Sequence, residues 1–314
     1  MAEMLCRAVV ITGDPDAGSV VPEVCREASS TLRDFTLLQE DVLSPGTACR
    51  ALFVAPETLS LTELRDRVRL AFADRPLDIN VVADDIAFTR KRLLVADMES
   101  TIIEQEMLDE LAGEIGLRDK VAAITERAMR GELDFEAALN ERVALLAGLD
   151  ASILDRLTAE RITLMPGAET LIATMKANGA YCALVSGGFT CFTAPVAKRL
   201  GFDEHQANTL EVIEGKITGR VIPPILGRAA KRAALERIAA QHGIDPVLTL
   251  AVGDGANDLD MLAAAGLGVA FRAKPKVREA ALSNPGGAVI THGDLTALLY
   301  LQGYADREHI ARAT

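Results

Sequence analysis

Two apolar segments that each end abruptly in an aspartate constrain this chain more than any other feature. The first is LLVADMEST at residues 93–101, which contains Asp97, and the second is LTLAVGDGANDLDM at 248–261, which contains Asp254. Both apolar runs have the pattern of buried strands, and ligands bind at the carboxyl ends of strands in an open parallel sheet. Two such strands can place two carboxylates over one site, which suits a hard divalent cation and a phosphate.

Each segment also has a simpler interpretation. Thr101 and Glu104 have the spacing of a helix capping box, and GDGAND is a glycine-rich turn. We expect the hydroxyl and backbone N–H groups of Ser100 and Thr101 to begin the next helix, an arrangement that caps a helix and also binds anions. The presence of both segments in one chain favours a functional site over two unrelated turns.

Several separated motifs extend from about Lys91 to about Gly293, and they carry a resemblance to a known family. They are DMESTIIEQEMLDELA at 97–112, AMRGELDFEAALNERVALL at 128–146, LVSGGF at 184–189, GRAAKRAAL at 227–235 and GDGANDLDM at 253–261. In this order they resemble the haloacid dehalogenase-type phosphatases and, within that superfamily, the bacterial phosphoserine phosphatases. One position departs from the family pattern, because the second acidic residue of the first motif is normally Asp and here is Glu99.

Composition excludes several partners. The 314 residues carry a formal net charge of −12, and an acidic balance argues against nucleic acid or an anionic membrane surface as a partner. No stretch is long and apolar enough to span a bilayer, which excludes a membrane pump, and the chain lacks a Walker-type phosphate loop. The five cysteines are widely spaced without a CxxC pair, as is typical of a reducing compartment. We therefore expect a cytoplasmic protein.

Residues 1–88 have the pattern of a separate small domain. Expected strands cover 6–12, 35–43, 49–55 and 77–83, and expected helices cover 18–32 and 61–72. The order βαββαβ is that of a ferredoxin-like unit, and it resembles an ACT-type regulatory domain in element order alone. Such a domain could bind an amino acid or act as a scaffold or dimerisation module, in which case the protein would be a homodimer.

Residues 89–314 instead alternate strands with helices, which indicates an α/β fold with a doubly wound parallel sheet. Expected strands are 93–96, 181–186, 248–253 and 267–271. The almost wholly helical stretch at about 105–160 predicts a cap over the site, and caps of this kind exclude water and select substrate. The resemblance implies that this unit is a Rossmann-like phosphatase core of the haloacid dehalogenase type.

The resemblance also implies roles for the residues of the motifs. Asp97 would attack phosphorus to form an aspartyl-phosphate, and Glu99 would act as general acid and base. Ser186 and Lys231 would bind the phosphate oxygens. Mg²⁺ would be the cofactor, and the groups that would hold it are the carboxylates of Asp97 and Asp254, the backbone carbonyl of Glu99 and, through the outer shell, Asp258.

Substrate selection is expected from the cap, because phosphoserine carries an ammonium and a carboxylate beside its phosphate. The resemblance implies that Glu106 pairs with the ammonium and that Arg142 grips the carboxylate. The remaining residues with an implied substrate contact are Met129, Phe135, Ser186, Gly187 and Asn257. Without the resemblance, Glu106 and Arg142 would be interpreted as exposed surface residues, and Met129 and Phe135 as core.

Three functions stay open at this point. The first is Mg²⁺-dependent hydrolysis of O-phospho-L-serine to L-serine and phosphate, and the second is the same chemistry on another small phosphomonoester such as phosphohomoserine. The third is a sensor that binds serine or phosphate with little turnover, which only Glu99 and the N-terminal domain favour. A phosphorylated amino acid is the expected partner for the first two functions.

Overall fold

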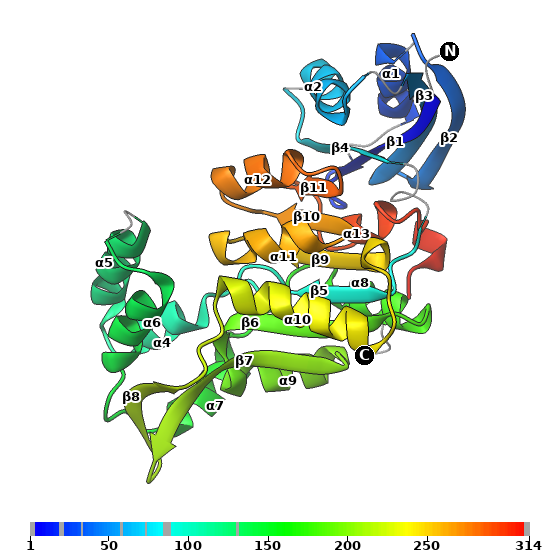
Figure 1. The fold of residues 1–314 in the computed structure, drawn as a ribbon. Helices are drawn as coiled ribbons and strands as arrows, with labels where there is room; N and C mark the ends of the chain where they lie inside the picture. Colours follow the sequence, from blue (N-terminus) through cyan, green and yellow to red (C-terminus); the bar gives the residue numbers. More distant parts are fainter. Residues whose placement is uncertain are drawn as a thin grey trace.

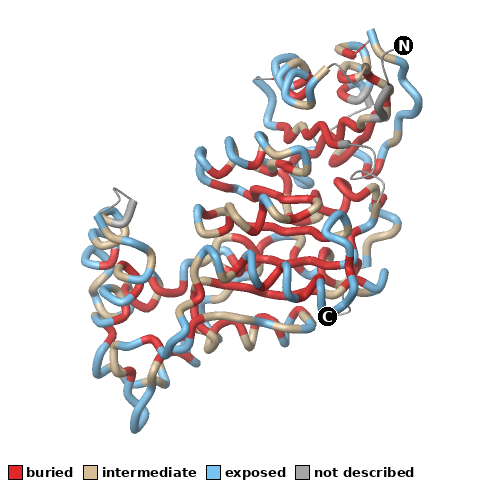
Figure 2. Tube along the Cα trace, in the orientation of Figure 1, coloured by how far each residue is buried: buried red, intermediate tan, exposed pale blue. Residues whose placement is uncertain are grey.

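The structure is a computed structural model that describes residues 4–18, 22–32, 34–56, 59–72, 74–83, 89–129 and 132–310. Figure 1 shows a central α/β core with a small N-terminal unit above it and a helical cap at its left. The central strands of the core, β5 (Leu93–Ala96), β9 (Thr249–Gly253) and β10 (Leu267–Phe271), are buried along their whole length, as the red trace in Figure 2 shows. No helix in the described ranges is long and apolar enough to cross a membrane.

The N-terminal unit is a four-stranded antiparallel sheet with two helices. Its elements are β1 Met4–Gly13, α1 Pro22–Thr31, β2 Thr36–Ser44, β3 Ala48–Pro56, α2 Leu61–Ala71 and β4 Leu77–Ala83. The strand order is β2-β3-β1-β4, so the expected βαββαβ order and an antiparallel sheet are both observed. Val9 and Ile11 of β1 pack under the two helices, whereas Ala8 and Val10 face the core, as the period-two alternation of a strand requires.

The core contains a seven-stranded sheet in the order β11-β10-β9-β5-β6-β7-β8. Its strands are β5 Leu93–Ala96, β6 Tyr181–Phe189, β7 Glu204–Ile213, β8 Lys216–Ile222, β9 Thr249–Gly253, β10 Leu267–Phe271 and β11 Gly287–Ile290. All pairings are parallel except that of β8 with β7. The four expected strands are present, with β6 extending three residues further than predicted, and β7, β8 and β11 were not predicted.

Helices cover both faces of this sheet, as the doubly wound prediction requires. Residues Leu94 and Ala96 of β5 belong to the apolar cluster that contains α8 Ala168–Ala177, α9 Thr190–Leu200 and α13 Ala297–Tyr300. Residues Leu93 and Val95 belong to the cluster on the other face, with α10 Arg228–Gln241, α11 Leu259–Ala264 and α12 Pro275–Leu282. Because helices bury both faces of the central strands, every residue of β5, β9 and β10 is buried and nearly all are apolar.

Five described helices lie between β5 and β6, and the first four form the insertion that we call the cap. These four are α4 Met107–Glu114, α5 Arg118–Met129, α6 Phe135–Ala144 and α7 Ser152–Arg161. The β7–β8 hairpin reaches this insertion, where the Gly148 N–H donates to the Ile217 carbonyl at 2.8 Å and the Ile217 N–H donates to the Leu149 carbonyl at 2.9 Å. The hairpin therefore ties the far side of the cap to the core.

The prediction that a helix begins at Ser100 and Thr101 is wrong, because the first helix after β5 begins at Met107. The chain instead turns, and the Ile102 and Ile103 N–H groups donate to the Met98 carbonyl at 2.8 and 2.9 Å. Both isoleucine side chains are fully buried, so burial of this apolar pair overrides the local capping pattern.

Side chains of β4 hold the N-terminal unit against β11, the edge strand of the core sheet. The Asp78 carboxylate accepts hydrogen bonds from the backbone N–H groups of Thr291, His292 and Gly293 at 2.7–2.9 Å. The Asn80 side chain donates to the Val289 carbonyl at 3.0 Å and accepts from its N–H at 2.8 Å. These contacts satisfy backbone groups that an open sheet edge leaves unpaired.

Arg65 of α2 adds further contacts between the N-terminal unit and the core. We call this interface, formed by Arg65, Asp78 and Asn80, the seam. It is 4% exposed, and its guanidinium donates to the carbonyls of Leu282, Asn284, Pro285 and Gly287, around the carboxyl end of α12. Burial lowers the pKa of Arg65 to about 10. A cation at a helix carboxyl end is favourable, so the carbonyls partly compensate for the lost hydration of the guanidinium.

We expect Asp78→Ala to destabilise the whole protein by about 3 kcal/mol, because three backbone N–H groups, one of them buried and two part-buried, lose their acceptor. Equilibrium unfolding in urea would measure the change. Asp66→Ala is the matched control, because Asp66 is exposed on α2 and surface substitutions change stability by about 0.5 kcal/mol or less. Equal stability of the two variants would contradict a structural role for the seam.

Candidate active site

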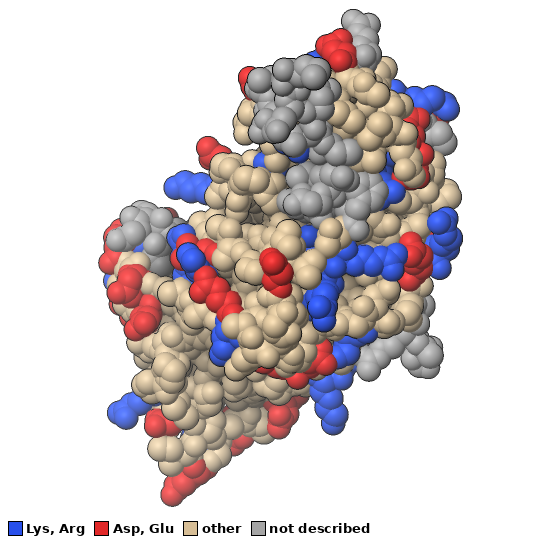
Figure 3. All heavy atoms as spheres, turned by 45° about the vertical axis from the view of Figure 1, so that its right-hand side comes forward, with Lys and Arg blue, Asp and Glu red and all other residues tan. Residues whose placement is uncertain are grey.

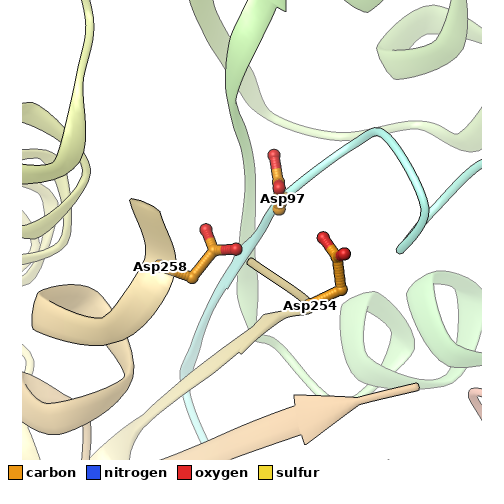
Figure 4. Close-up of side chains that lie close together, drawn as sticks. All are labelled: Asp97, Asp254 and Asp258. Carbon is orange, nitrogen blue, oxygen red and sulfur yellow. The ribbon is translucent and has the colours of Figure 1, made fainter. Parts of the chain in front are cut away.

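Three aspartates converge at the carboxyl ends of two neighbouring strands. Asp97 follows β5, Asp254 follows β9, and Asp258 ends the short 3₁₀ turn Ala256–Asp258. Each offers one carboxylate oxygen, and the three oxygens lie within 4.8 Å of one another. Figure 4 shows the three side chains directed toward a common point. β5 and β9 pair directly in the sheet, which is why residues far apart in sequence meet there.

Lys231, in the first turn of α10, neutralises part of this charge. Its Nζ lies 2.8 Å from Oδ1 of Asp97 and 2.6 Å from Oδ1 of Asp258, and its side chain is 0% exposed. Oδ1 of Asp97 also accepts the Met98 N–H at 2.8 Å. Within the described residues, Oδ2 of Asp97 is therefore the oxygen that has no protein hydrogen bond, and it is available to react.

Burial and like charge shift the protonation of the cluster. Burial, with a further contribution from Asp258, raises the pKa of Asp97, and Lys231 opposes this rise. The same two causes raise the pKa of Asp254 to about 6. Burial alone would lower the pKa of Lys231, but attraction to Asp258 and Asp97 outweighs it and the net pKa is raised. An excess of negative charge thus remains at the site, and a cation would relieve it.

Glu99 lies where the core meets the cap. Its Oε1 accepts the Met107 N–H at 2.9 Å. A Cβ added to Gly188 would lie only 2.6 Å from Oε2 of Glu99, so a side chain there would displace the Glu99 carboxyl group from this position. Burial, with repulsion from Glu106, raises the pKa of Glu99 to about 8. A raised pKa favours the protonated form that a proton donor needs at neutral pH.

The end of β6 supplies the loop that is expected to bind the phosphate. Ser186 is fully buried, and its Oγ accepts the Gly188 N–H at 2.9 Å. The Asn208 side chain donates to the Gly187 carbonyl at 2.8 Å and fixes the loop from the neighbouring β7. Asn208 was not predicted, because the sequence gives no sign that β7 exists.

The two expected selectivity residues stand at the base of the cap. Glu106 precedes α4, and its Oε1 accepts the Ser100 hydroxyl at 2.7 Å. Arg142 donates through Nε to the Ala138 carbonyl at 3.2 Å. Burial lowers the pKa of Arg142, and the charges of Asp109, Glu99 and Glu106 oppose this effect. The structure thus places Arg142 within the electrostatic reach of Glu106 and Glu99.

Phe135 brings the cap into contact with the core loops. Its ring lies 3.4 Å from where a Cβ on Gly187 would stand and 3.3 Å from the equivalent position on Gly227. The Asn257 amide lies 3.6 Å from the same Gly187 position, so both residues border the phosphate loop. Met129 ends α5, but its side chain lies outside the described residues.

A glycine beside the metal-ligand loop was also missed. A Cβ on Gly253 would lie 2.3 Å from the Asp258 carboxyl carbon, so only glycine allows Asp258 to fold back toward Lys231. The signal available in the sequence was the first glycine of GDGAND, which a turn alone does not require.

The donor set fits a hard divalent cation. Carboxylate oxygens are the preferred ligands of Mg²⁺, which is usually held by one or two carboxylates and by substrate phosphate. Asp97 and Asp254 would supply the carboxylates, with Asp258 fixed behind them by Lys231. The raised pKa values of Asp97 and Asp254 describe the site without a cation.

Comparison with known proteins agrees with this geometry. Residues 94–263 match the model of the haloacid dehalogenase-like hydrolase family, and the chain belongs to that family. A phosphoserine phosphatase of Streptomyces coelicolor is 49% identical over 304 residues, which cover 96% of this chain and 71% of that protein. A phosphoserine phosphatase of Mycobacterium tuberculosis is 45% identical over 250 residues, or 80% of this chain and 58% of that protein.

A solved structure extends the similarity to three dimensions. The crystal structure of a probable phosphoserine phosphatase from Vibrio cholerae superimposes with a TM-score of 0.76 and 33% identity, covering 96% of this chain and 88% of the other.

On the face shown in Figure 3, basic and acidic side chains of the described residues are interspersed.

Proposed function

We propose that this chain is a Mg²⁺-dependent phosphoserine phosphatase that works through an aspartyl-phosphate. The observation that carries the proposal is the buried Lys231, which holds Asp97 through one oxygen and leaves the other oxygen free inside a three-aspartate cluster. The two phosphoserine phosphatases 45–49% identical to this chain support the same substrate.

Substrate would bind between the cluster and the cap. Its phosphate would lie over Asp97 and accept hydrogen bonds from the Ser186 loop. Its carboxylate would pair with Arg142, and its ammonium with Glu106. The amide of Asn257 borders the same loop, and Phe135 would close the site against water.

In the first half-reaction, Oδ2 of Asp97 attacks phosphorus and the bond between phosphorus and the serine oxygen breaks. The serine oxygen takes the proton of Glu99, whose raised pKa of about 8 keeps that proton available at neutral pH. Serine leaves, and an aspartyl-phosphate and a Glu99 carboxylate remain. Lys231 stays between Asp97 and Asp258 and offsets the negative charge on the phosphoryl oxygens.

In the second half-reaction, a water molecule attacks the phosphorus of the aspartyl-phosphate. Glu99 takes a proton from this water, and the bond between phosphorus and Asp97 breaks. Phosphate leaves, and both carboxyl groups return to their starting states. When bound, Mg²⁺ would draw negative charge from the phosphoryl oxygens, and Asp97, Asp254 and the Glu99 carbonyl would hold it with support from Asp258.

The N-terminal unit, which we propose as a separate domain of residues 1–88, would have a regulatory or dimerisation role. Its element order supports an ACT-like assignment. Exposed Leu37, Leu38 and Val42 on β2, at the edge of its sheet, support self-association into a homodimer. The core and cap, residues 89–314, would carry the chemistry, and a cytoplasmic location stays a prediction.

We expect Asp97→Asn to lower turnover of phosphoserine by about a thousandfold or more, because an amide cannot form the phosphoenzyme. Removing Mg²⁺ with a chelator should abolish activity in the parent, and returning Mg²⁺ should restore it. The parent phosphoenzyme should be trapped in acid and cleaved by hydroxylamine. Asp66→Asn, on the exposed face of α2, is the control. Substantial turnover in Asp97→Asn would refute the nucleophile assignment.

We expect Arg142→Ala to weaken binding of phosphoserine by about 2–5 kcal/mol, because a carboxylate loses its charged partner. The KM for O-phosphoethanolamine, which lacks the carboxylate, should change far less. Steady-state kinetics on both substrates would measure the difference, with Arg156→Ala in the exposed part of α7 as the control. Equal losses on the two substrates would mean that Arg142 supports the fold rather than the substrate.

We expect Glu99→Gln to lower turnover by about 100-fold or more, because Gln cannot transfer the proton. Gln can still accept the Met107 N–H, so substrate and Mg²⁺ should still bind. Glu99→Asp should keep much of the turnover, since the two acids have similar reference pKa values. Single-turnover kinetics would separate the two variants. Parental activity in Glu99→Gln would favour the sensor function over the enzyme.

A further inference from the structure

Ser100 makes a contact that the proposed chemistry does not use. Its hydroxyl donates to Oε1 of Glu106 at 2.7 Å. Glu106 occupies the residue before α4, where a side chain often caps the helix, but its carboxylate makes no such bond. Oε1 is therefore committed to Ser100, and Oε2 has no hydrogen-bond partner among the described residues.

The backbone of Ser100 is held in a conformation that a residue with a Cβ adopts infrequently. Its φ is +53°, one of three such non-glycine values within the described residues. Strained backbone of this kind persists where the surrounding structure holds it, and it often occurs at binding sites. At Ser100 the strain aims a hydroxyl at Glu106.

A second bond fixes the neighbouring pair of residues. Glu99 accepts the Met107 N–H at 2.9 Å, so two successive residues of the core loop bind two successive residues at the start of the cap. The Glu99 bond fixes the backbone of the cap, and the Ser100 bond fixes the Glu106 side chain. Only the second bond acts on the group that would meet the substrate ammonium.

We propose that Ser100 is a specificity-determining positioning residue that orients Glu106 toward the ammonium of an amino-acid phosphate. This inference rests on the proposed function. Glu106 is exposed, and a free glutamate side chain would have to be ordered each time substrate bound, at a cost in affinity. The Ser100 hydroxyl orders it beforehand, so that Oε2 faces the substrate while Oε1 is already occupied.

The test compares phosphoserine with 3-phosphooxypropionate, which is phosphoserine without its ammonium. Ser100→Ala and Ser100→Gly both remove the hydroxyl, and Gly also accepts a φ of +53° without strain. We expect the KM for phosphoserine to rise about 5–10-fold in both variants. The kcat should stay within about twofold, and both constants for 3-phosphooxypropionate should be unchanged. If Ser100→Ala fails to fold, Ser100→Gly alone decides the outcome.

A double-mutant cycle with Glu106→Gln tests whether Ser100 acts through Glu106. Because Gln loses the charge that attracts the ammonium, adding Ser100→Gly should then change the KM for phosphoserine by less than about twofold. Ser152→Ala, on α7, should behave as the parent.

The outcomes distinguish failure of the proposed ammonium recognition from failure of the proposed role of Ser100. A parent enzyme that does not prefer phosphoserine over 3-phosphooxypropionate would overturn the proposed ammonium recognition. A parent that does prefer it, with unchanged preference in the Ser100 variants, would overturn the role of Ser100 alone. Equal losses on both substrates would also overturn it, because they would indicate a structural effect.

Discussion

The bond between the buried Lys231 ammonium and the two carboxylates of Asp97 and Asp258 is the interaction on which the rest of the structure depends. Taking a charge out of water costs several kcal/mol, and the cost is recovered only when partners of opposite charge are close and well oriented. Lys231 and Asp258 are completely buried, and Asp97 nearly so. These residues come from α10, the turn after β9 and the end of β5, so three segments must meet at one point with little error.

The same crowding explains why several glycines surround the cluster. Gly253 leaves space for the Asp258 carboxylate, and Gly188 leaves space for Glu99. A side chain at Gly253 would move the Asp258 carboxylate from Lys231 while leaving it buried, which is the costly case for buried charge. The site therefore depends on the close approach of the Gly253 and Gly188 backbone to the carboxyl groups, as well as on the carboxyl groups themselves.

The sequence predicts those parts of the molecule whose pattern is local. β5 and β9 are apolar runs that end in aspartate, and the helices of the cap repeat apolar residues at helical spacing. β7 and β8 contain many polar residues because they are partly exposed, and their burial does not alternate regularly. β11 has only four residues. None of the three strands therefore has a clear apolar pattern in the sequence. The start of α4 at Met107 could not be predicted, because it depends on burial of Ile102 and Ile103 by distant parts of the chain.

The seam was not predicted, although Asp78 and Asn80 occupy alternate positions, and hence one face, of an otherwise apolar strand.

That seam has a consequence for how the protein is made. Asp78 and its partner His292 are 214 residues apart in sequence, and Arg65 and its partner Leu282 are 217 apart. During synthesis the N-terminal unit leaves the ribosome before the core. The Arg65 guanidinium can then bond only the Val81 carbonyl of its own unit, whereas its other four acceptors and the N–H partners of Asp78 lie near the end of the core. Contacts of such long range form slowly, because a large loop must close before they contribute. The nascent N-terminal unit therefore exposes the Ala8 and Val10 side of its sheet throughout translation, and docking onto β11 is a late step of folding.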